Sequence, residues 1–152
     1  MAHHRVSASA VIPAPATKIY ALIADYRNGH PRILPKPYFV SLTVEQGGVG
    51  AGTVITFQMK LMGRLQTFHS VITEPEPGRV LAETDPTTGT VTTFTVEPRE
   101  GGQQAYVTIT TDTQVPDGLA GAIQGWLTTR LLHPIYVKEL AQLASVTAQG
   151  PP

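Results

Sequence analysis

The 152-residue sequence contains no cysteine, and its eleven basic residues are balanced by eleven acidic ones. Without cysteine there is no disulfide bond, thiolate nucleophile or cysteine metal site, so stability must come from packing. Lysine and arginine form no cluster, which argues against binding to nucleic acid or to an anionic membrane surface. No apolar run approaches the roughly 20 residues of a spanning helix, and residues 1–5 lead into no signal-peptide core. These absences predict a cytoplasmic protein with no nucleic-acid partner and no integral membrane segment.

Motifs for metal, nucleotide and serine chemistry are missing as well. The five histidines show no paired ligand spacing and no HExxH motif, so no metal site is expected. The stretch GGVGAG at residues 47–52 does not fit GxGxxG, because Thr53 stands where the last glycine would fall. No GxSxG nucleophile elbow is present. We therefore expect no cofactor and no catalytic triad.

The composition is that of a globular chain with one core. Hydrophobic residues make up 41% of the sequence, and a chain of this length buries roughly 70% of the surface that its unfolded form exposes. The 14 glycines and 13 prolines lie between patterned runs, where they mark turns. We predict a single domain over residues 1–148 and a flexible tail over residues 149–152. The sequence leaves the oligomeric state open.

Hydrophobic periodicity outlines the first elements. Residues 6–12 alternate in the way of a strand with one buried face, and Pro13 ends this run. Pro15 suits the first position of a helix. A one-faced apolar stripe follows at Ile19, Leu22, Ile23 and Tyr26. The prolines and Asn28-Gly29 leave room for one further short helical turn before residue 36.

The rest of the chain reads as strands followed by one long helix. Six alternating runs between residues 39 and 115 are joined by short Gly- and Pro-rich links, which favours antiparallel hairpins. Helical spacing returns from Leu119 to Leu131 and resumes from Val137 to Ala144. Because Pro134 stands inside this pattern, we predict a kink or break near residues 132–133. A long helix after a meandering sheet has to lie on one face of the sheet, and a curled sheet leaves a cavity beneath the helix.

Five segments form a recognisable pattern: VxAxAVIPAPATKIYALIADYRN at residues 6–28, GGVGAGT at 47–53, VITEPEPGRVL at 71–81, FTVEPREGGQQAYVTIT at 94–110 and KELAQLA at 138–144. With these segments the chain resembles the START-like, helix-grip superfamily, in particular its polyketide cyclase/dehydrase branch. The resemblance implies an α+β fold in which a curved antiparallel sheet of about seven strands wraps around the long C-terminal helix, with two short helices after strand 1. It also implies a cavity for a small apolar molecule such as a lipid, polyketide or isoprenoid. It transfers no catalytic residue to this chain.

Strand parity predicts which side chains face the cavity. A two-residue turn at residues 62–63, the PEPG turn and the REGG turn fix which residues lie opposite each other. The resulting pairs are Met59–Gln66, Phe57–Phe68, Ile55–Ser70, Ile72–Leu81, Ser70–Glu83, Val96–Ala105 and Phe94–Val107. The candidate ligand-binding residues of the sheet are therefore Ile55, Phe57, Met59, Phe68, Ser70, Ile72, Leu81, Glu83, Phe94 and Val107. A one-residue bulge would turn part of this set to the other face.

The C-terminal helix adds a second set of candidates. Its spacing predicts that Ile123, Trp126, Leu127 and Arg130 face the ligand. Gly121 and Gly125 lie one helical turn apart, and either a cavity or close backbone packing explains them.

Glu83 is the one candidate for acid–base catalysis on the inner face. A carboxyl group on an apolar surface has a raised pKa and can act as an acid or a base. A bulge that turns Glu83 outward is the competing interpretation.

Three functions remain open on the sequence. The first is a carrier or binding domain for a small, largely apolar ligand, without catalysis. The second is a polyketide cyclase/dehydratase-like enzyme that uses Glu83 or a residue of the short helices. The third is a protein-interaction module whose interior is solid core. Polar groups that converge inside a cavity distinguish an enzyme from a carrier, and the cavity itself distinguishes both from the third.

Overall fold

The computed structural model describes residues 1–149. Its elements are β1 (Ala2–Ile12), α1 (Ala16–Ala24), η1 (His30–Ile33), β2 (Phe39–Gln46), β3 (Val54–Leu61), β4 (Arg64–Glu76), β5 (Val80–Thr84), β6 (Val91–Arg99), η2 (Glu100–Gly102), β7 (Gln104–Val115) and α2 (Gly118–Ala148). Of the predicted tail, only Gln149 lies among the described residues.

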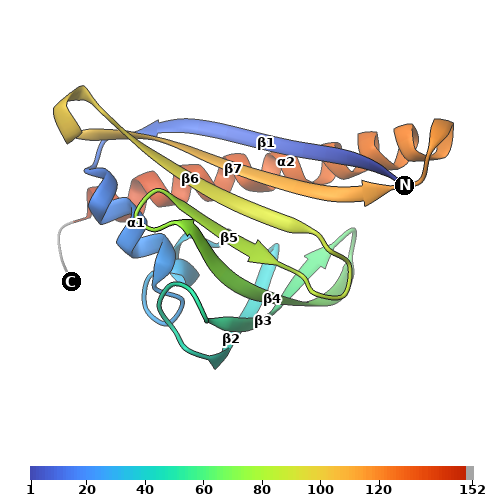
Figure 1. The fold of residues 1–152 in the computed structure, drawn as a ribbon, viewed down its shortest axis with the longest axis horizontal. Helices are drawn as coiled ribbons and strands as arrows, with labels where there is room; N and C mark the ends of the chain where they lie inside the picture. Colours follow the sequence, from blue (N-terminus) through green and yellow to red (C-terminus); the bar gives the residue numbers. More distant parts are fainter. Residues whose placement is uncertain (150–152) are drawn as a thin grey trace.

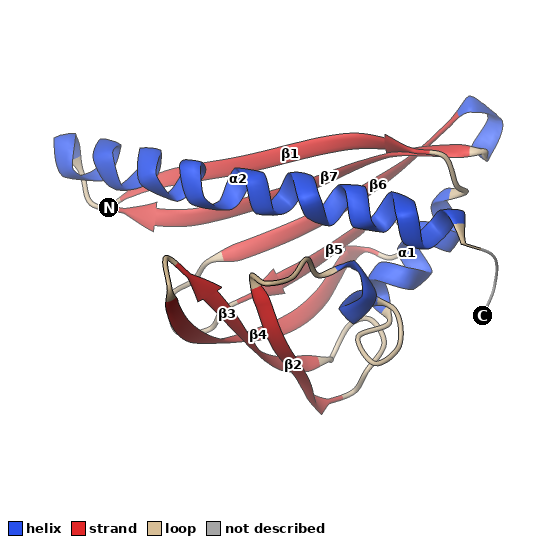
Figure 2. Cartoon of the chain, turned by 180° about the vertical axis from the view of Figure 1, so that it is seen from behind, coloured by secondary structure: helices blue, strands red, loops and turns tan. Residues whose placement is uncertain are grey.

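All seven strands form one antiparallel sheet in the order β1-β7-β6-β5-β4-β3-β2. The helix α2 packs mainly against β1, η1 and β7, and Figure 2 shows it running the length of these strands. The sheet then curves away beneath α2 toward β2 and β3, while α1 lies across one end (Figure 1). The α+β helix-grip fold is confirmed.

The core lies between α1, η1, the C-terminal half of α2 and the strands that these helices cover. Its largest fully buried side chains are mostly branched aliphatics: Ile12, Ile19, Ile23, Ile33, Ile55, Ile72, Leu81, Ile109, Ile135 and Leu143. On β1 the buried side chains alternate with serines that pair with threonines of β7 on the outer face, as a half-buried strand requires. The described chain therefore has one continuous core at the α1 end of the sheet.

The predicted registers are partly right. The β3–β4 pairs are as predicted, with Phe57 opposite Phe68. The other two hairpins are shifted by two residues, so that Ile72 lies opposite Glu83 and Phe94 opposite Ile109. A register irregularity between Thr73 and Glu76 and the short η2 helix make these turns longer than the two residues assumed. Because the shift is even, the inner face keeps the predicted side chains.

The predicted break near residues 132–133 is wrong, because α2 is one helix from Gly118 to Ala148 with Pro134 inside it. Pro134 lies on the exposed side of the helix. There the Arg130 carbonyl, which loses its helical N–H partner, faces solvent and can accept a hydrogen bond from water. Water can therefore replace the hydrogen bond that Pro134 cannot donate, and the helix continues without a break.

Among residues 1–149, no helix combines the length and the apolar character that crossing a membrane requires.

Candidate active site

Two adjoining cavities lie between the concave face of the sheet and the helices. The inner pocket has a volume of about 70 Å³. It is lined by His30, Leu34, Phe39, Leu42, Ile55, Phe57, Met59, Glu83, Thr92, Phe94, Tyr136 and Glu139. The outer chamber is larger, at about 660 Å³, and lies between β3, β4, the β5–β6 connection and the middle of α2. Phe57, Met59, Glu83, Thr92 and Tyr136 line both cavities. One molecule is therefore able to extend from one cavity into the other.

The segment between α1 and β2 positions two polar side chains over the inner pocket. The Tyr26 N–H donates to the Gly48 carbonyl at 2.8 Å, which anchors the chain after α1. At Gly29 an added Cβ would lie 2.3 Å from the Leu22 carbonyl oxygen, so only glycine allows this tight approach. The chain then turns into η1, whose first residue is the buried His30. The rings of Tyr26 and His30 stack with their centroids 4.4 Å apart.

Glu83 faces the inner pocket from β5, as strand parity predicts, and no bulge turns it outward. Its side chain is 12% exposed. The Tyr26 hydroxyl donates to Glu83 Oε2 at 2.6 Å, and His30 Nε2 lies 3.6 Å from the same oxygen. Burial, followed by the charge of Glu83, raises the pKa of Tyr26 well above its usual value, so the tyrosine stays a hydrogen-bond donor.

His30 presents a free lone pair toward Glu83. Its Nδ1 lies 2.7 Å from the Ile23 carbonyl oxygen, which can only accept, so Nδ1 carries the proton. Burial lowers the pKa of His30 more than the nearby Glu83 and the bond to Ile23 raise it. The ring is therefore neutral at pH 7, and its Nε2 lone pair is available as a base beside the Glu83 carboxylate.

Glu139 is the second carboxyl group of the inner pocket. It is 3% exposed, and no hydrogen bond or ion pair joins its side chain to another residue among those described. Burial, with a further contribution from Glu83, raises the pKa of Glu139 well above its usual value. Glu139 therefore keeps its proton to a higher pH than an exposed carboxyl group does, and its O–H is free to donate to a bound molecule.

Hydroxyl groups complete the wall between the two cavities. Tyr136 lies one turn before Glu139 on α2, and its hydroxyl bonds to Thr111 Oγ1. Thr111 Oγ1 bonds in turn to Thr92 Oγ1 at 2.8 Å. Burial raises the pKa of Tyr136 to about 12. This chain of three neutral hydroxyls can donate to, or accept from, an oxygen of a ligand.

The structure brings most of the predicted sheet residues to the cavities. Ile55, Phe57, Met59, Glu83 and Phe94 line the inner pocket, and Phe68 and Ser70 line the outer chamber. Ile72, Leu81 and Val107 are fully buried core residues and line neither cavity.

The predicted helix residues are on a different face. Ile123, Trp126 and Leu127 are each more than half exposed, and the guanidinium of Arg130 lies 5.3 Å from the Trp126 ring centroid. The helix instead lines the outer chamber with Gln124, Thr128, Leu131, Leu132 and Tyr136. At 100° per residue Trp126 lies roughly opposite Thr128 on the helix. The apolar spacing identified a stripe of α2, but not the side that the sheet covers.

The sequence interpretation named Tyr26 only as part of an apolar stripe, missed Tyr136 and Glu139, and did not single out His30 within the segment of short helices. One signal was available for Glu139. It lies three residues after Tyr136 and directly before Leu140, so it shares their buried side of the helix. A fully buried acidic residue is rare unless it is paired.

No group of three or more His, Cys, Asp or Glu side chains within residues 1–149 has the arrangement of a metal site.

Known structures show the same fold at low identity. The KanY protein (ms6282) is 24% identical with a TM-score of 0.77, and the match covers 98% of this chain and 100% of KanY. The ZhuI aromatase/cyclase from Streptomyces sp. R1128 is 19% identical with a TM-score of 0.74, over 97% and 94% of the two chains. A START superfamily protein from Mycobacterium smegmatis is 15% identical with a TM-score of 0.72, over 96% and 98%. No curated protein matches the sequence significantly.

The family described as polyketide cyclase/dehydrase and lipid transport matches residues 3–148, which is nearly the whole chain. The curved sheet, the long helix and the cavity between them agree with this match. The protein belongs to the polyketide cyclase/dehydrase and lipid transport family.

Proposed function

We propose that the protein is an enzyme of the cyclase/dehydratase type that moves protons on a small carbonyl compound bound in the inner pocket. The observation that carries this proposal is the convergence of two carboxyl groups, Glu83 and Glu139, with His30 in one apolar pocket. Polar groups that converge inside a cavity favour an enzyme over a carrier.

Glu83 and His30 act as the base. The Tyr26 hydroxyl orients the Glu83 carboxylate, and the neutral His30 Nε2 lies 3.6 Å from it. A proton taken from the carbon next to a ligand carbonyl is held between these two groups. The electron pair of the broken C–H bond moves onto the carbonyl oxygen and forms an enolate.

Glu139 acts as the acid. Its free O–H gives a proton to the enolate oxygen, which completes enolisation. In a β-hydroxy ketone the same proton goes to the leaving hydroxyl, the C–O bond breaks and water departs as the carbon–carbon double bond forms. Attack of the enolate carbon on a second carbonyl of the same molecule closes a ring, and Glu139 protonates the new alkoxide.

The apolar lining of the inner pocket strengthens both the base and the acid. Ile55, Phe57 and Phe94 line the pocket beside the carboxyl groups, and an apolar wall lowers the local dielectric, so each charge interaction is larger than in water. A carrier of apolar ligands has no need of a carboxyl group that lines its pocket without a protein partner, because removing such a group from bulk water costs folding stability. This cost supports a catalytic role for Glu139.

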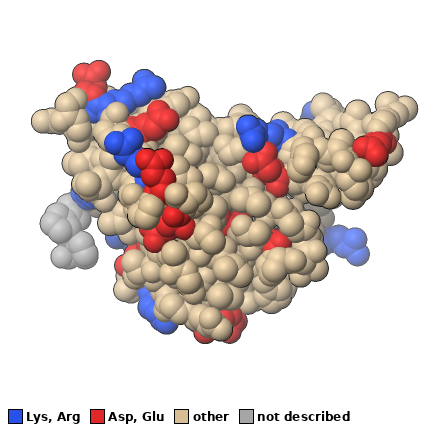
Figure 3. Space-filling model, viewed as in Figure 1, with Lys and Arg blue, Asp and Glu red and all other residues tan. Residues whose placement is uncertain are grey.

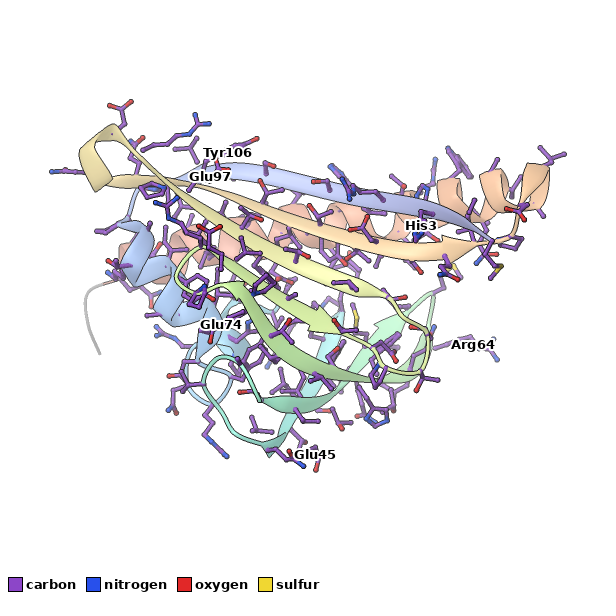
Figure 4. The ribbon with its side chains drawn as sticks, viewed as in Figure 1. His3, Glu45, Arg64, Glu74, Glu97 and Tyr106 are labelled. Carbon is purple, nitrogen blue, oxygen red and sulfur yellow. The ribbon has the colours of Figure 1, made fainter. Side chains whose placement is uncertain are left out.

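The test measures α-proton exchange of 1-tetralone in D₂O by NMR, with the carbonyl end of the probe in the inner pocket and its aromatic ring extending into the outer chamber. We expect the wild-type protein to accelerate exchange, and Glu83→Gln and Glu139→Gln each to reduce the acceleration by about 100-fold or more, the usual contribution of a general acid or base. Glu97→Gln is the control, because Glu97 is exposed on the outer face of β6 (Figure 4) and should leave exchange unchanged. Absence of acceleration by the wild type, or equal rates in the two pocket variants and the wild type, would favour the carrier.

A further inference from the structure

The outer chamber has a polar wall that proton transfer in the inner pocket does not explain. Eight of the residues that line it are threonines, and Ser70, Gln66 and Gln124 line it too. A chamber that served only an apolar tail would lose hydrogen bonds to water at each of these groups when filled. The wall therefore points to a ligand with oxygen atoms of its own.

The hydroxyl groups of this wall offer more acceptors than donors. Thr88 donates to Thr90 Oγ1 at 3.1 Å, and Thr90 Oγ1 lies 3.0 Å from Thr113 Oγ1. In such a chain of three hydroxyls, two of the three hydrogens are used internally while several lone pairs stay free. The acidic Glu83 and Asp85 add further acceptors to the same chamber. Gln66, Gln124 and His69 add N–H donors to the wall, so a complementary ligand both donates and accepts hydrogen bonds, as a hydroxyl group does.

The charges of the wall exclude an anionic ligand. No lysine or arginine lines the outer chamber. Arg64, at the β3–β4 turn close to the chamber, extends outward from the sheet (Figure 4). Charged side chains are also scattered over the neighbouring outer face (Figure 3). A carboxylate or phosphate in the chamber would meet the carboxyl groups of Glu83 and Asp85, and among the described residues that line the chamber only His69 is able to carry a positive charge.

Apolar groups face the hydroxyls across the chamber. The rings of Phe57 and Phe68 stack with centroids 5.3 Å apart, and Leu131 and Leu132 of α2 line the same space. Aromatic and aliphatic surfaces pack against the C–H faces of a sugar or polyol while hydroxyls bind its edges. The outer chamber has both the apolar surfaces and the hydroxyl groups that binding of a sugar or polyol requires.

We propose that the outer chamber binds a neutral, hydroxyl-rich segment of the glycosyl or polyol class, which belongs to the molecule whose reactive carbonyl enters the inner pocket. The inference rests on the proposed function for the role of the inner pocket and deepens it by naming the class of ligand. Phe57 and Thr92, which line both cavities, mark the junction between the two parts of the ligand.

The test compares three probes whose alkyl chains have seven or eight carbons: octyl β-D-glucoside, octanoate and 1-octanol. Titration calorimetry at pH 7 should show the glucoside binding at least about 10-fold more tightly than octanoate. The double variant Thr90→Val/Thr113→Val removes two hydroxyls at nearly constant volume and should weaken the glucoside about 10-fold while leaving 1-octanol unchanged. Thr95→Val, on the face of β6 opposite to Phe94 and Val96, is the matched control and should change nothing.

Octanoate binding as tightly as the glucoside, or a double variant that binds the glucoside like the wild type, would overturn the inference. Glu139→Gln should leave the glucoside affinity intact, because Glu139 does not line the outer chamber. If the wild type shows no acceleration of 1-tetralone exchange but still prefers the glucoside, the proposed enzyme is rejected and the chamber assignment is kept. If the wild type accelerates 1-tetralone exchange but does not prefer the glucoside, the proposed enzyme is kept and the chamber assignment is rejected.

Discussion

Gly121→Ala is expected to lower the free energy of unfolding by about 3–5 kcal/mol, in the range of severe backbone conflicts. Alanine is normally the better helix former by about 1 kcal/mol. At this position, however, the added Cβ would lie 1.6 Å from the main-chain oxygen of Pro116. Main chain cannot rotate away, so the link from β7 into α2 would have to move. Thermal unfolding should show a drop in Tm of roughly 10 °C.

Two other variants provide comparisons for the loss of stability expected of Gly121→Ala. At Gly125 an added Cβ would lie 2.6 Å from Nδ1 of the His4 ring, which can turn aside at the cost of its 2.7 Å bond to Thr129. Gly125→Ala should therefore be milder than Gly121→Ala. Ala122→Gly, at an exposed helix position, should cost only about 1 kcal/mol. A Gly121→Ala protein as stable as the wild type would show that Pro116 is not locked against α2. Of the two explanations open on the sequence, the structure supports close packing for both glycines.

Glu139→Gln is expected to stabilise the protein at pH 8 and to remove part of its pH dependence. The pKa of Glu139 is raised in the folded state, so the folded protein keeps a proton that the unfolded chain releases above about pH 4.5. Its contribution to stability is complete below that pH and is lost as the pH rises toward the folded pKa. At pH 8 the variant should be more stable by about 1.4 kcal/mol for each unit by which folding raises the pKa of Glu139.

Comparison with the wild type at several pH values isolates this effect. His30 has a lowered pKa, so its own contribution is lost as the pH falls below about 6.5, which is the opposite direction. Tyr26 and Tyr136 titrate only in the alkaline range. Urea unfolding from pH 4 to pH 8 should show the two proteins converging at pH 4 and separating as the pH rises. Equal separation at every pH would contradict a titrating Glu139. Glu97→Gln, at an exposed site, should follow the wild type throughout.

The sequence by itself determined the elements and the inner face of the sheet. Alternation along β1 and the 3.6-residue stripe of α1 depend on which side chains can be buried locally, and the structure has both elements there. The two-residue turn at Met62-Gly63 fixed the β3–β4 register, because a turn of known length leaves one pairing. Glu83 faced inward as parity placed it, even though two turns were longer than assumed.

Only the tertiary structure decided which side of α2 faces the cavity and whether the helix continues through Pro134. Two apolar sides of α2 are nearly equivalent in sequence, and only the curvature of the sheet determines that Thr128 and Tyr136 face the cavity while Trp126 lies outside. Pro134 is tolerated because its side of the helix is exposed.

The active-site cluster was also beyond the sequence. Residues as distant as Tyr26, Glu83 and Glu139 share one pocket only after α1, β5 and α2 have packed together. Their pKa values follow from burial and mutual charge, both of which are properties of that packing rather than of the local sequence.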